Sequence, residues 1–407
     1  MMDFVNKIFR GDKVIWMIFV SLCVISIIEV YSASSMLTFK TSYWQPIMKH
    51  TMFLLAGVVI VLLVHSMNPK HFWIFVVALP FVWVLLVATQ FMGHTVNGAN
   101  RYLFGFQPSE IAKLCLISFV AFILSRQNRK ISESVSFKWA WFTSIITCAL
   151  IVRDNLSTAA ILYCVICIMM FLGQVSFKRL GIVALTTALG ISLLFGFIWF
   201  FPDKAKDVGL RRGVLWVERL NNYNEQPEIT KDGKIPDDRF QETMAKIAVA
   251  RGGIINMPGS SHQSSLLPQA YSDFIYAIII EESGIVGGIF VLALYVFLFI
   301  RAGTIAGRCP KLFPKLLVMG CALMLVLQAL VNMAVSVGLM PVTGQPLPLV
   351  SKGGSSILIT CVFIGIILSV SRFENPKGVQ QEATFEEEFE EEKRLANEDE
   401  QFDIQVV

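Results

Sequence analysis

Ten apolar runs constrain this chain more than any other feature of its sequence. A lipid interior has no water to satisfy backbone N–H and C=O groups, so a spanning segment must bond its own backbone as a helix of about 20 residues. Only 16% of the 407 residues are charged and 55% are hydrophobic, whereas soluble domains carry about 25% charged residues. The sequence therefore predicts an all-α polytopic integral membrane protein with ten transmembrane helices. The runs begin near Val14, Thr51, Phe72, Pro108, Trp139, Thr158, Gly181, Asp273, Leu312 and Gly354.

The basic residues of the short loops indicate how these runs are oriented, because cytoplasmic loops carry an excess of Lys and Arg. Most of them fall on one side, and the short loops of the other side have only Lys40, Lys49, Arg101, Arg153 and Lys352. This pattern predicts that both termini are cytoplasmic, at 1–13 and 374–407, around a membrane domain at 14–373. A large extracytoplasmic loop, 202–272, then lies between helices seven and eight. The tail is acidic and is expected to be disordered.

Carboxylates lie in and beside an apolar run in the stretch LLPQAYSDFIYAIIIEESGIVGG, residues 266–288. Asp273 is at the border of the run. On one continuous helix Glu281 and Glu282 would lie roughly 12 to 14 Å deeper in the apolar layer. A buried acid costs about 2.5 to 3.5 kcal/mol on insertion scales, so these residues indicate a functional site. The alternative is structural: Asp273 caps a helix and the glutamates form internal salt bridges.

A second pair of charges follows Pro108, which suits the first turn of a helix. Glu110 and Lys113 are three residues apart, so they can form an ion pair on one helix face, which makes both less costly to bury. The pair is either part of a site or a neutral tether between helices. Arg101, in the preceding outer loop, has a guanidinium group suited to a phosphate.

The segment MPVTGQPLPLVSKGGSS, residues 340–356, has three prolines and three glycines and cannot form a continuous helix. Irregular backbone at that level is tolerated where it is buried in protein or lines a wet cavity. The sequence GGSS at a helix start offers backbone N–H groups to an anion, and the alternative is a tight turn that binds nothing.

The long loop holds a basic group at Arg211, Arg212 and Arg219 and a helical pattern from Phe240 to Arg251. That pattern predicts an amphipathic helix on the membrane surface, with Gln241 on its polar face. The loop is nearly neutral, which gives no support to a role in nucleic-acid binding.

These motifs together resemble the FtsW/RodA family, the SEDS proteins that polymerise peptidoglycan glycan strands. The resemblance covers roughly residues 13–373 in the family's order and spacing. It consists of VYSASS at 30–35, GANRY and FGFQPSEIAKL within 97–114, the long loop, the acidic stretch at 266–288, and PVTGQPLPLVSKGGSS.

The resemblance implies a bacterial inner-membrane glycosyltransferase that uses lipid II and releases undecaprenyl diphosphate. It implies that Asp273 is the catalytic base. A divalent cation, Mg²⁺ or Mn²⁺, is a possible cofactor, and its ligands are unknown. The implied partners are lipid II, membrane lipids, a class B penicillin-binding protein and divisome proteins. The expected substrate-binding residues are Arg101, Glu110, Lys113, Ser351, Gly354 and Ser355, and the expected supporting residues are Arg212, Gln241 and Glu282.

Two departures from the family pattern bear on the site. Where the family commonly reads QPDLGTA this chain reads RDNLSTA, so Asn155 takes the usual place of an aspartate, with Asp154 next to it. Lys352 replaces an aromatic residue, which we expect to add a cation near an anionic lipid head group.

The GANR motif favours the division branch, FtsW, and hence septal synthesis; an elongation polymerase of the RodA type is the alternative. Two other functions fit the same residues, a lipid II flippase with the buried charges along its path, and a scaffold for the transpeptidase. A scaffold would not need Asp273.

Overall fold

The computed structural model describes residues 10–33, 44–96, 99–103, 105–127, 131–153, 155–207, 213–214, 216–217, 237–256 and 271–373. Within these residues, nine helices are long and apolar enough to cross a membrane. They are α2 (Lys13–Ala33), α3 (Trp44–Ser66), α4 (Trp73–Met92, preceded by the short helix η2, Pro69–Phe72), α5 (Pro108–Ser125), α6 (Glu133–Val152), α8 (Phe177–Phe200), α12 (Ile275–Arg308), α13 (Leu312–Ser336) and α14 (Gly354–Phe373).

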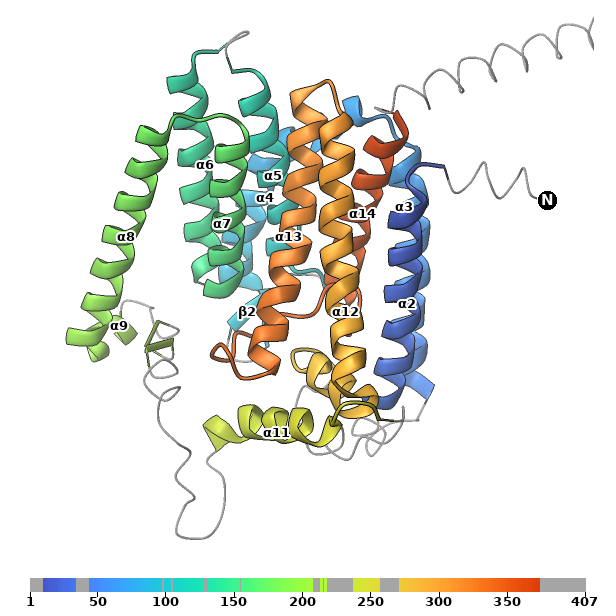
Figure 1. The fold of residues 1–407 in the computed structure, drawn as a ribbon. Coiled ribbons are helices and arrows are strands. Elements are labelled where there is room, and N and C mark those ends of the chain that lie inside the picture. Colours follow the sequence, from blue (N-terminus) through green and yellow to red (C-terminus); the bar gives the residue numbers. More distant parts are fainter. Residues whose placement is uncertain are drawn as a thin grey trace, which may run out of the picture.

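The remaining apolar run forms α7 (Leu156–Leu172), which is 17 residues long and shorter than the others. The all-helical membrane architecture is confirmed, and the tenth crossing stays a prediction. The first and last described segments meet at one end of the bundle (Figure 1). There the backbone N–H of Asp12 donates to Ser371 Oγ at 3.0 Å, and Arg301 Nε pairs with Asp12 Oδ2 at 2.7 Å.

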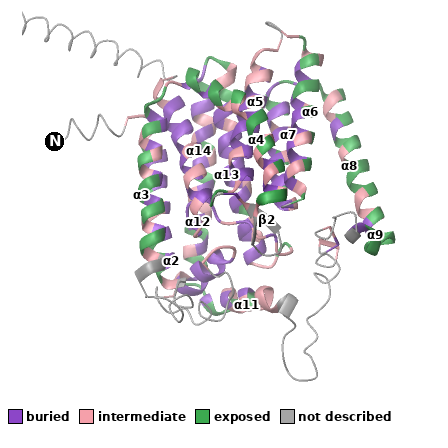
Figure 2. Ribbon diagram, turned by 180° about the vertical axis from the view of Figure 1, so that it is seen from behind, coloured by how far each residue is buried: buried purple, intermediate pink, exposed green. Residues whose placement is uncertain are grey.

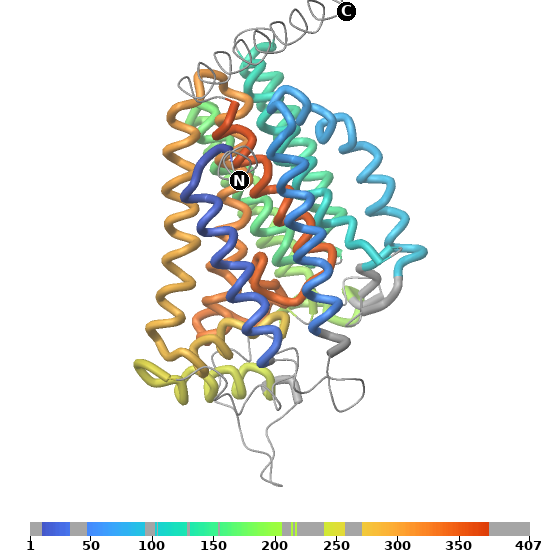
Figure 3. The backbone as a smooth tube through the Cα atoms, turned by 90° about the vertical axis from the view of Figure 1, so that its right-hand side faces the viewer, coloured from blue at the N-terminus to red at the C-terminus, as the bar shows by residue number. Residues whose placement is uncertain are grey.

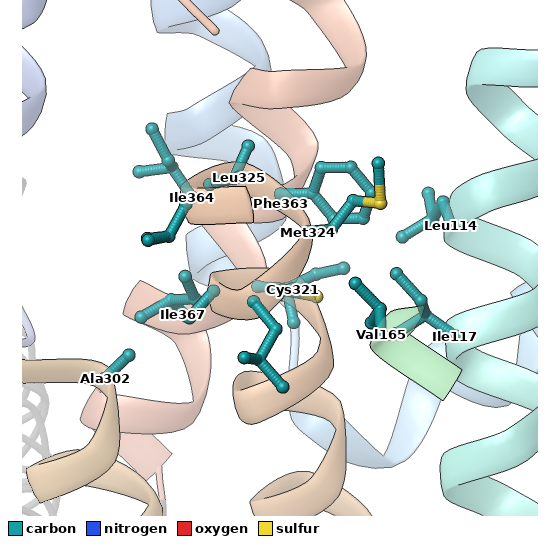
Figure 4. Packing of buried hydrophobic residues seen from close by; sticks show 14 of the residues in the cluster. Leu114, Ile117, Val165, Ala302, Cys321, Met324, Leu325, Phe363, Ile364 and Ile367 are labelled. Carbon is teal, nitrogen blue, oxygen red and sulfur yellow. The ribbon is translucent and has the colours of Figure 1, made fainter. Parts of the chain in front are cut away.

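Helices α13, α14 and α5 form the centre of the bundle, as their mostly buried surfaces show in Figure 2. Figure 4 shows Cys321 and Met324 of α13 among side chains of α5, α7 and α14. Gly320 permits this approach, since a Cβ there would lie 2.6 Å from Ile117. Helix α8 lies apart from this core (Figure 1), and only Val183 and Ile198 are buried along its length. Its exposed apolar side chains suit a surrounding of lipid.

Helices α3 and α14 run side by side in the same direction (Figure 3). Glycines make the contact close: a Cβ on Gly57 would lie 2.6 Å from Cys361 Sγ, and one on Gly354 would lie 2.9 Å from the Phe53 ring. The first residues of α14 are therefore fixed against the first turns of α3.

The opposite end of the bundle from the termini is the outer end in the predicted orientation. It carries a two-stranded antiparallel sheet of β1 (His94–Val96) and β2 (Ala99–Tyr102). It also carries the short helix α9 (Pro202–Asp207) and helix α11 (Asp237–Gly252), which crosses the end of the bundle (Figure 3).

Helix α11 confirms the helical pattern expected from Phe240 to Arg251. Its apolar face packs against protein: Ala245 and Ala248 form a buried cluster with Phe274 and Ala277 of the α12 region. The helix expected to lie on the membrane surface is thus fixed on the segment that carries Asp273.

Candidate functional site

Asp273 lies immediately before α12, whose N-cap residue is Phe274. The capping role considered for Asp273 is therefore wrong. Its Oδ1 instead accepts a hydrogen bond from Ser272 Oγ at 3.0 Å, and its backbone carbonyl accepts one from Asn332 Nδ2 at 2.8 Å. The carboxylate also lies close to Gly344, where a Cβ would be 3.5 Å from Oδ2.

The negative charge of Asp273 affects the pKa of Tyr271, two residues earlier in the chain. Burial, and secondly the negative charge of Asp273, raise the pKa of the Tyr271 phenol. The carboxylate is half-buried at the outer end of the bundle, where a polar head group can approach it. Its main chain is fixed by α13, and this position suits a group that must hold and then release a proton.

Two amide side chains of α13, Gln328 and Asn332, hold the site together. Both are almost fully buried and lie one helical turn apart. Asn332 Nδ2 donates to the carbonyl of Asp273 and, at 2.7 Å, to that of Gln345, so its amide orientation is fixed by two acceptors. Gln328 Nε2 donates to the Pro346 carbonyl at 3.0 Å. Hydrogen bonds from α13 therefore hold the irregular segment that follows this helix against the helix itself.

Lys113 and Glu110 form the ion pair that their spacing predicts. Lys113 Nζ lies 2.8 Å from Glu110 Oε2, and 1% of the lysine side chain is exposed. The ammonium also donates to Gln328 Oε1 at 3.1 Å. Burial of this kind is tolerated because each charge has hydrogen-bonding partners. The pair links α5 to α13, and through Gln328 it reaches Pro346.

Irregular backbone was expected within 340–356, and the structure has it up to residue 353, before α14 begins at Gly354. The φ angle is positive at Gly344 and Leu349 in this segment and at Gly338 just before it. Ser351 is buried; its hydroxyl donates to the Ser272 carbonyl at 2.5 Å and accepts from the Leu347 backbone N–H at 2.7 Å. That hydroxyl therefore supports the Asp273 segment from the other side.

Gly354 begins α14 and packs closely against the Phe53 ring, which would lie 2.9 Å from a Cβ at this position. The next residue, Ser355, is buried in the first turn. These two residues place the first backbone N–H groups of α14 next to the segment that carries Lys352.

Asn155, in the place of the family's aspartate, has a structural role. Its side chain caps α7 by accepting a hydrogen bond from the Thr158 backbone N–H at 3.2 Å. Thr158 Oγ1 then accepts one from Gln345 Nε2 at 2.8 Å. An amide oxygen caps a helix as a carboxylate does, so the substitution keeps this contact to the irregular segment.

The depth expected along one straight helix is wrong, because a kink at Gly284, where φ is 76° and ψ is −178°, separates the first turns of α12, which carry Glu281 and Glu282, from the rest of the helix. Glu282 accepts a hydrogen bond from Ser32 at the outer end of α2, and the Glu281 carbonyl accepts one from Asn256 at 2.8 Å. Both glutamates are buried, and Glu282 lies beside the last turn of α2.

Three of the positions named from the sequence are not described by the structure. The side chain of Arg101 on β2, and all of Arg212 and Asp154, lie outside the described residues. Gln241 is half-buried in α11, the helix that packs on Phe274.

Sequence reasoning missed Gln328 and Asn332, although two amides one turn apart in an apolar run are a signal that was present. It also missed Ser26, which contacts His50 of the next helix and donates to the carbonyl of Val350, 324 residues away.

A divalent cation was a possible cofactor. The described residues contain no group of three or more His, Cys, Asp or Glu side chains placed to hold a metal ion.

Fold and site together define a polytopic helical membrane protein with a carboxylate and a hydrogen-bonded polar network at one end of its bundle. The sequence model of the FtsW/RodA/SpoVE family, described as cell cycle proteins, matches residues 12–376. The chain belongs to this family.

Individual relatives agree with this assignment. The chain is 33% identical over 303 residues to a protein of Marinobacter nauticus named probable peptidoglycan glycosyltransferase FtsW, with 70% of each chain covered. It is 30% identical over 297 residues to the Escherichia coli peptidoglycan glycosyltransferase MrdB, covering 70% of this chain and 75% of that one.

Solved structures show the same fold. A chain from a peptidoglycan synthase complex, in a study of how polymerization and crosslinking are coordinated, matches with a TM-score of 0.70 at 22% identity. That match covers 90% of this chain and 99% of the other. RodA, the rod shape determining protein of Thermus thermophilus, matches with a TM-score of 0.61 at 22% identity, covering 89% and 97%.

Proposed function

We propose that this chain is a peptidoglycan glycosyltransferase of the bacterial inner membrane that polymerises lipid II. The observation that carries the proposal is the placement of Asp273, a half-buried carboxylate at the outer end of the bundle whose main chain is fixed by Asn332. The names of the family relatives support the same reaction class. The FtsW names of the relatives and the GANR motif favour septal synthesis. The distribution of basic residues favours a cytoplasmic location for both termini.

In the proposed reaction Asp273 accepts the proton of the acceptor sugar's C4 hydroxyl. The acceptor oxygen then forms a bond to the anomeric carbon of the donor, and the bond from that carbon to the diphosphate oxygen breaks. Undecaprenyl diphosphate leaves with the electron pair. Ser272 Oγ donates a hydrogen bond to Oδ1, which orients the Asp273 carboxylate.

Lys113 serves this reaction as a positioning residue. Its ammonium is occupied by Glu110 and Gln328, and it is too deeply buried to be the main contact of a diphosphate. We assign it the role of holding Gln328, and through it the segment around Pro346, in place beside Asp273. Arg101, on the outer hairpin, remains a candidate for direct contact with the diphosphate.

The proposed partner is a class B penicillin-binding protein that cross-links the glycan strands as they are made. A chain of the same fold belongs to a peptidoglycan synthase complex, which supports such a pairing. Divisome proteins are proposed as further partners.

The test is polymerisation of lipid II by the purified chain, with and without the transpeptidase, next to the variant Asp273→Ala. We expect glycan polymer from the native chain and none from the variant, with both proteins folded and inserted. Equal polymer from both would remove Asp273 from the reaction. Transport of lipid II across vesicles without any polymer would favour a flippase instead.

A further inference from the structure

Two lysines lie at the outer ends of neighbouring helices, outside the network described above. Lys49 is exposed in the first turns of α3, and Lys352 is half-buried just before α14. Both belong to the side that is poor in basic residues, where topology does not require positive charge.

A chain of hydrogen bonds connects the two lysine segments. His50, next to Lys49, is 2.8 Å from Ser26 Oγ of α2. Ser26 in turn donates to the carbonyl of Val350 at 2.9 Å, two residues before Lys352. Because the serine has a single proton, His50 must be the donor in the first contact. Helices α2 and α3 thus fix the backbone just before Lys352 relative to Lys49.

The positive charges of the two lysines act on each other. Burial, and secondly the charge of Lys49, lower the pKa of the Lys352 ammonium. Among the ion pairs of the described residues, none compensates either lysine with a carboxylate. Two like charges held together without a counter-ion disfavour the protonated form, and an anion between them would relieve this cost.

The lysine pair lies beside the catalytic carboxylate. Lys352 Nζ is 4.9 Å from the centre of the Tyr271 ring, and the Lys352 backbone N–H donates to the Tyr271 carbonyl at 2.9 Å. The phenol of Tyr271 is also within reach of the charge of Asp273. Tyr271 is therefore near both the cation and the base, and an anion held by the lysines would have its adjoining atoms on the Asp273 side of the bundle.

We propose that Lys49 and Lys352 form a binding site for the diphosphate group of the polyprenyl substrate, on the α3–α14 side of Asp273. The proposal rests on the proposed function, since it assigns the leaving group of that reaction to these two side chains. Ammonium groups bind phosphate oxygens as point charges and need no fixed geometry. The first backbone N–H groups of α14 lie next to Lys352 and can add hydrogen bonds to the same anion.

The test measures equilibrium binding of radiolabelled undecaprenyl diphosphate to the full chain in phosphatidylcholine nanodiscs. All proteins carry Asp273→Asn, so that no turnover occurs. We expect Lys49→Gln and Lys352→Gln each to weaken binding about tenfold, the usual loss for one charged hydrogen bond. Lys352→Arg should retain binding. The matched control is Lys315→Gln, an exposed lysine at the opposite end of the bundle, which should bind like the parent.

Binding that survives both Gln variants, or that falls equally in Lys315→Gln, would overturn the site. The site would also be overturned if phosphatidylglycerol displaced the radiolabelled lipid as well as unlabelled undecaprenyl diphosphate does, because that would show a general contact with anionic head groups. Melting curves and gel filtration establish that each variant is folded. If the lysines bind diphosphate in this test but the native chain, with Asp273 retained and its transpeptidase present, makes no polymer from lipid II, the site stands and the proposed glycosyl transfer is refuted.

Discussion

Replacing Lys113 with Met tests how the buried charge network stabilises the bundle. The variant leaves Glu110 with 6% of its surface exposed and no cation, and it also removes the bond to Gln328. Breaking a buried ion pair from one side costs about 3 to 5 kcal/mol, because the remaining charge is uncompensated. Adding Glu110→Gln removes that charge, and the double variant should lose only about 1 to 2 kcal/mol relative to the native chain.

The assay is reversible unfolding in mixed micelles titrated with sodium dodecyl sulfate. Lys246→Met is the matched control, since Lys246 pairs with Glu242 at 2.6 Å but half of its side chain is exposed. That variant should change stability by no more than about 0.5 kcal/mol. If the double variant were as unstable as the sum of its single variants, Lys113 would not be compensating Glu110, and the argument would fail.

Three further predictions concern the outer end of the bundle. Gly284→Ala should destabilise the protein by about 3 kcal/mol or more in the same titration, because φ at Gly284 is +76° and the new Cβ would lie 2.4 Å from a backbone carbonyl oxygen. The control, Gly303→Ala, places its Cβ in open space and should have no such effect. The carboxylate of Asn332→Asp cannot donate to the two carbonyl groups that Asn332 holds, so polymer formation should fall at least about tenfold while lipid II still binds. The control, Ser336→Ala, removes a hydroxyl without a partner and should leave the rate of polymer formation unchanged. A normal rate in Asn332→Asp would refute the positioning role of Asn332. Because the free Lys352 ammonium has a lowered pKa and a bound anion would raise it, diphosphate affinity should fall as pH rises through that lowered pKa. Lys352→Arg should remove this fall, and a decline at the same pH in the arginine variant would assign it to another group.

The sequence predicted those parts of the fold that depend on residues close together in the chain. Apolar runs predicted the helices, Pro108 marked the first residue of α5, and the prolines and glycines of 340–353 predicted irregular backbone. The contact between Glu110 and Lys113 also followed from their spacing. Each of these depends on residues within one turn or one loop, where spacing alone brings groups together.

The candidate site was less predictable because its contacts join segments distant in sequence. No local pattern reveals that Asn332 reaches the carbonyl of Asp273, or that Ser26 reaches that of Val350. The depth of Glu282 was misjudged because a glycine within an apolar run reads as helix, whereas Gly284 takes a backbone conformation that other residues rarely adopt.

The partners of α13 have a consequence for the order in which the protein is made. Lys113 and Gln328 are 215 residues apart, and Thr158 and Gln345 are 187 apart. A chain that emerges from its N-terminus exposes α5 to lipid long before α13 is synthesised. During that interval Glu110 is the charged partner that Lys113 has within its own helix, so the local pair lets the segment enter the bilayer before its permanent neighbour exists. The site around Asp273 then closes last, when α13 and the segment after it arrive, and an unfinished chain carries no assembled active site.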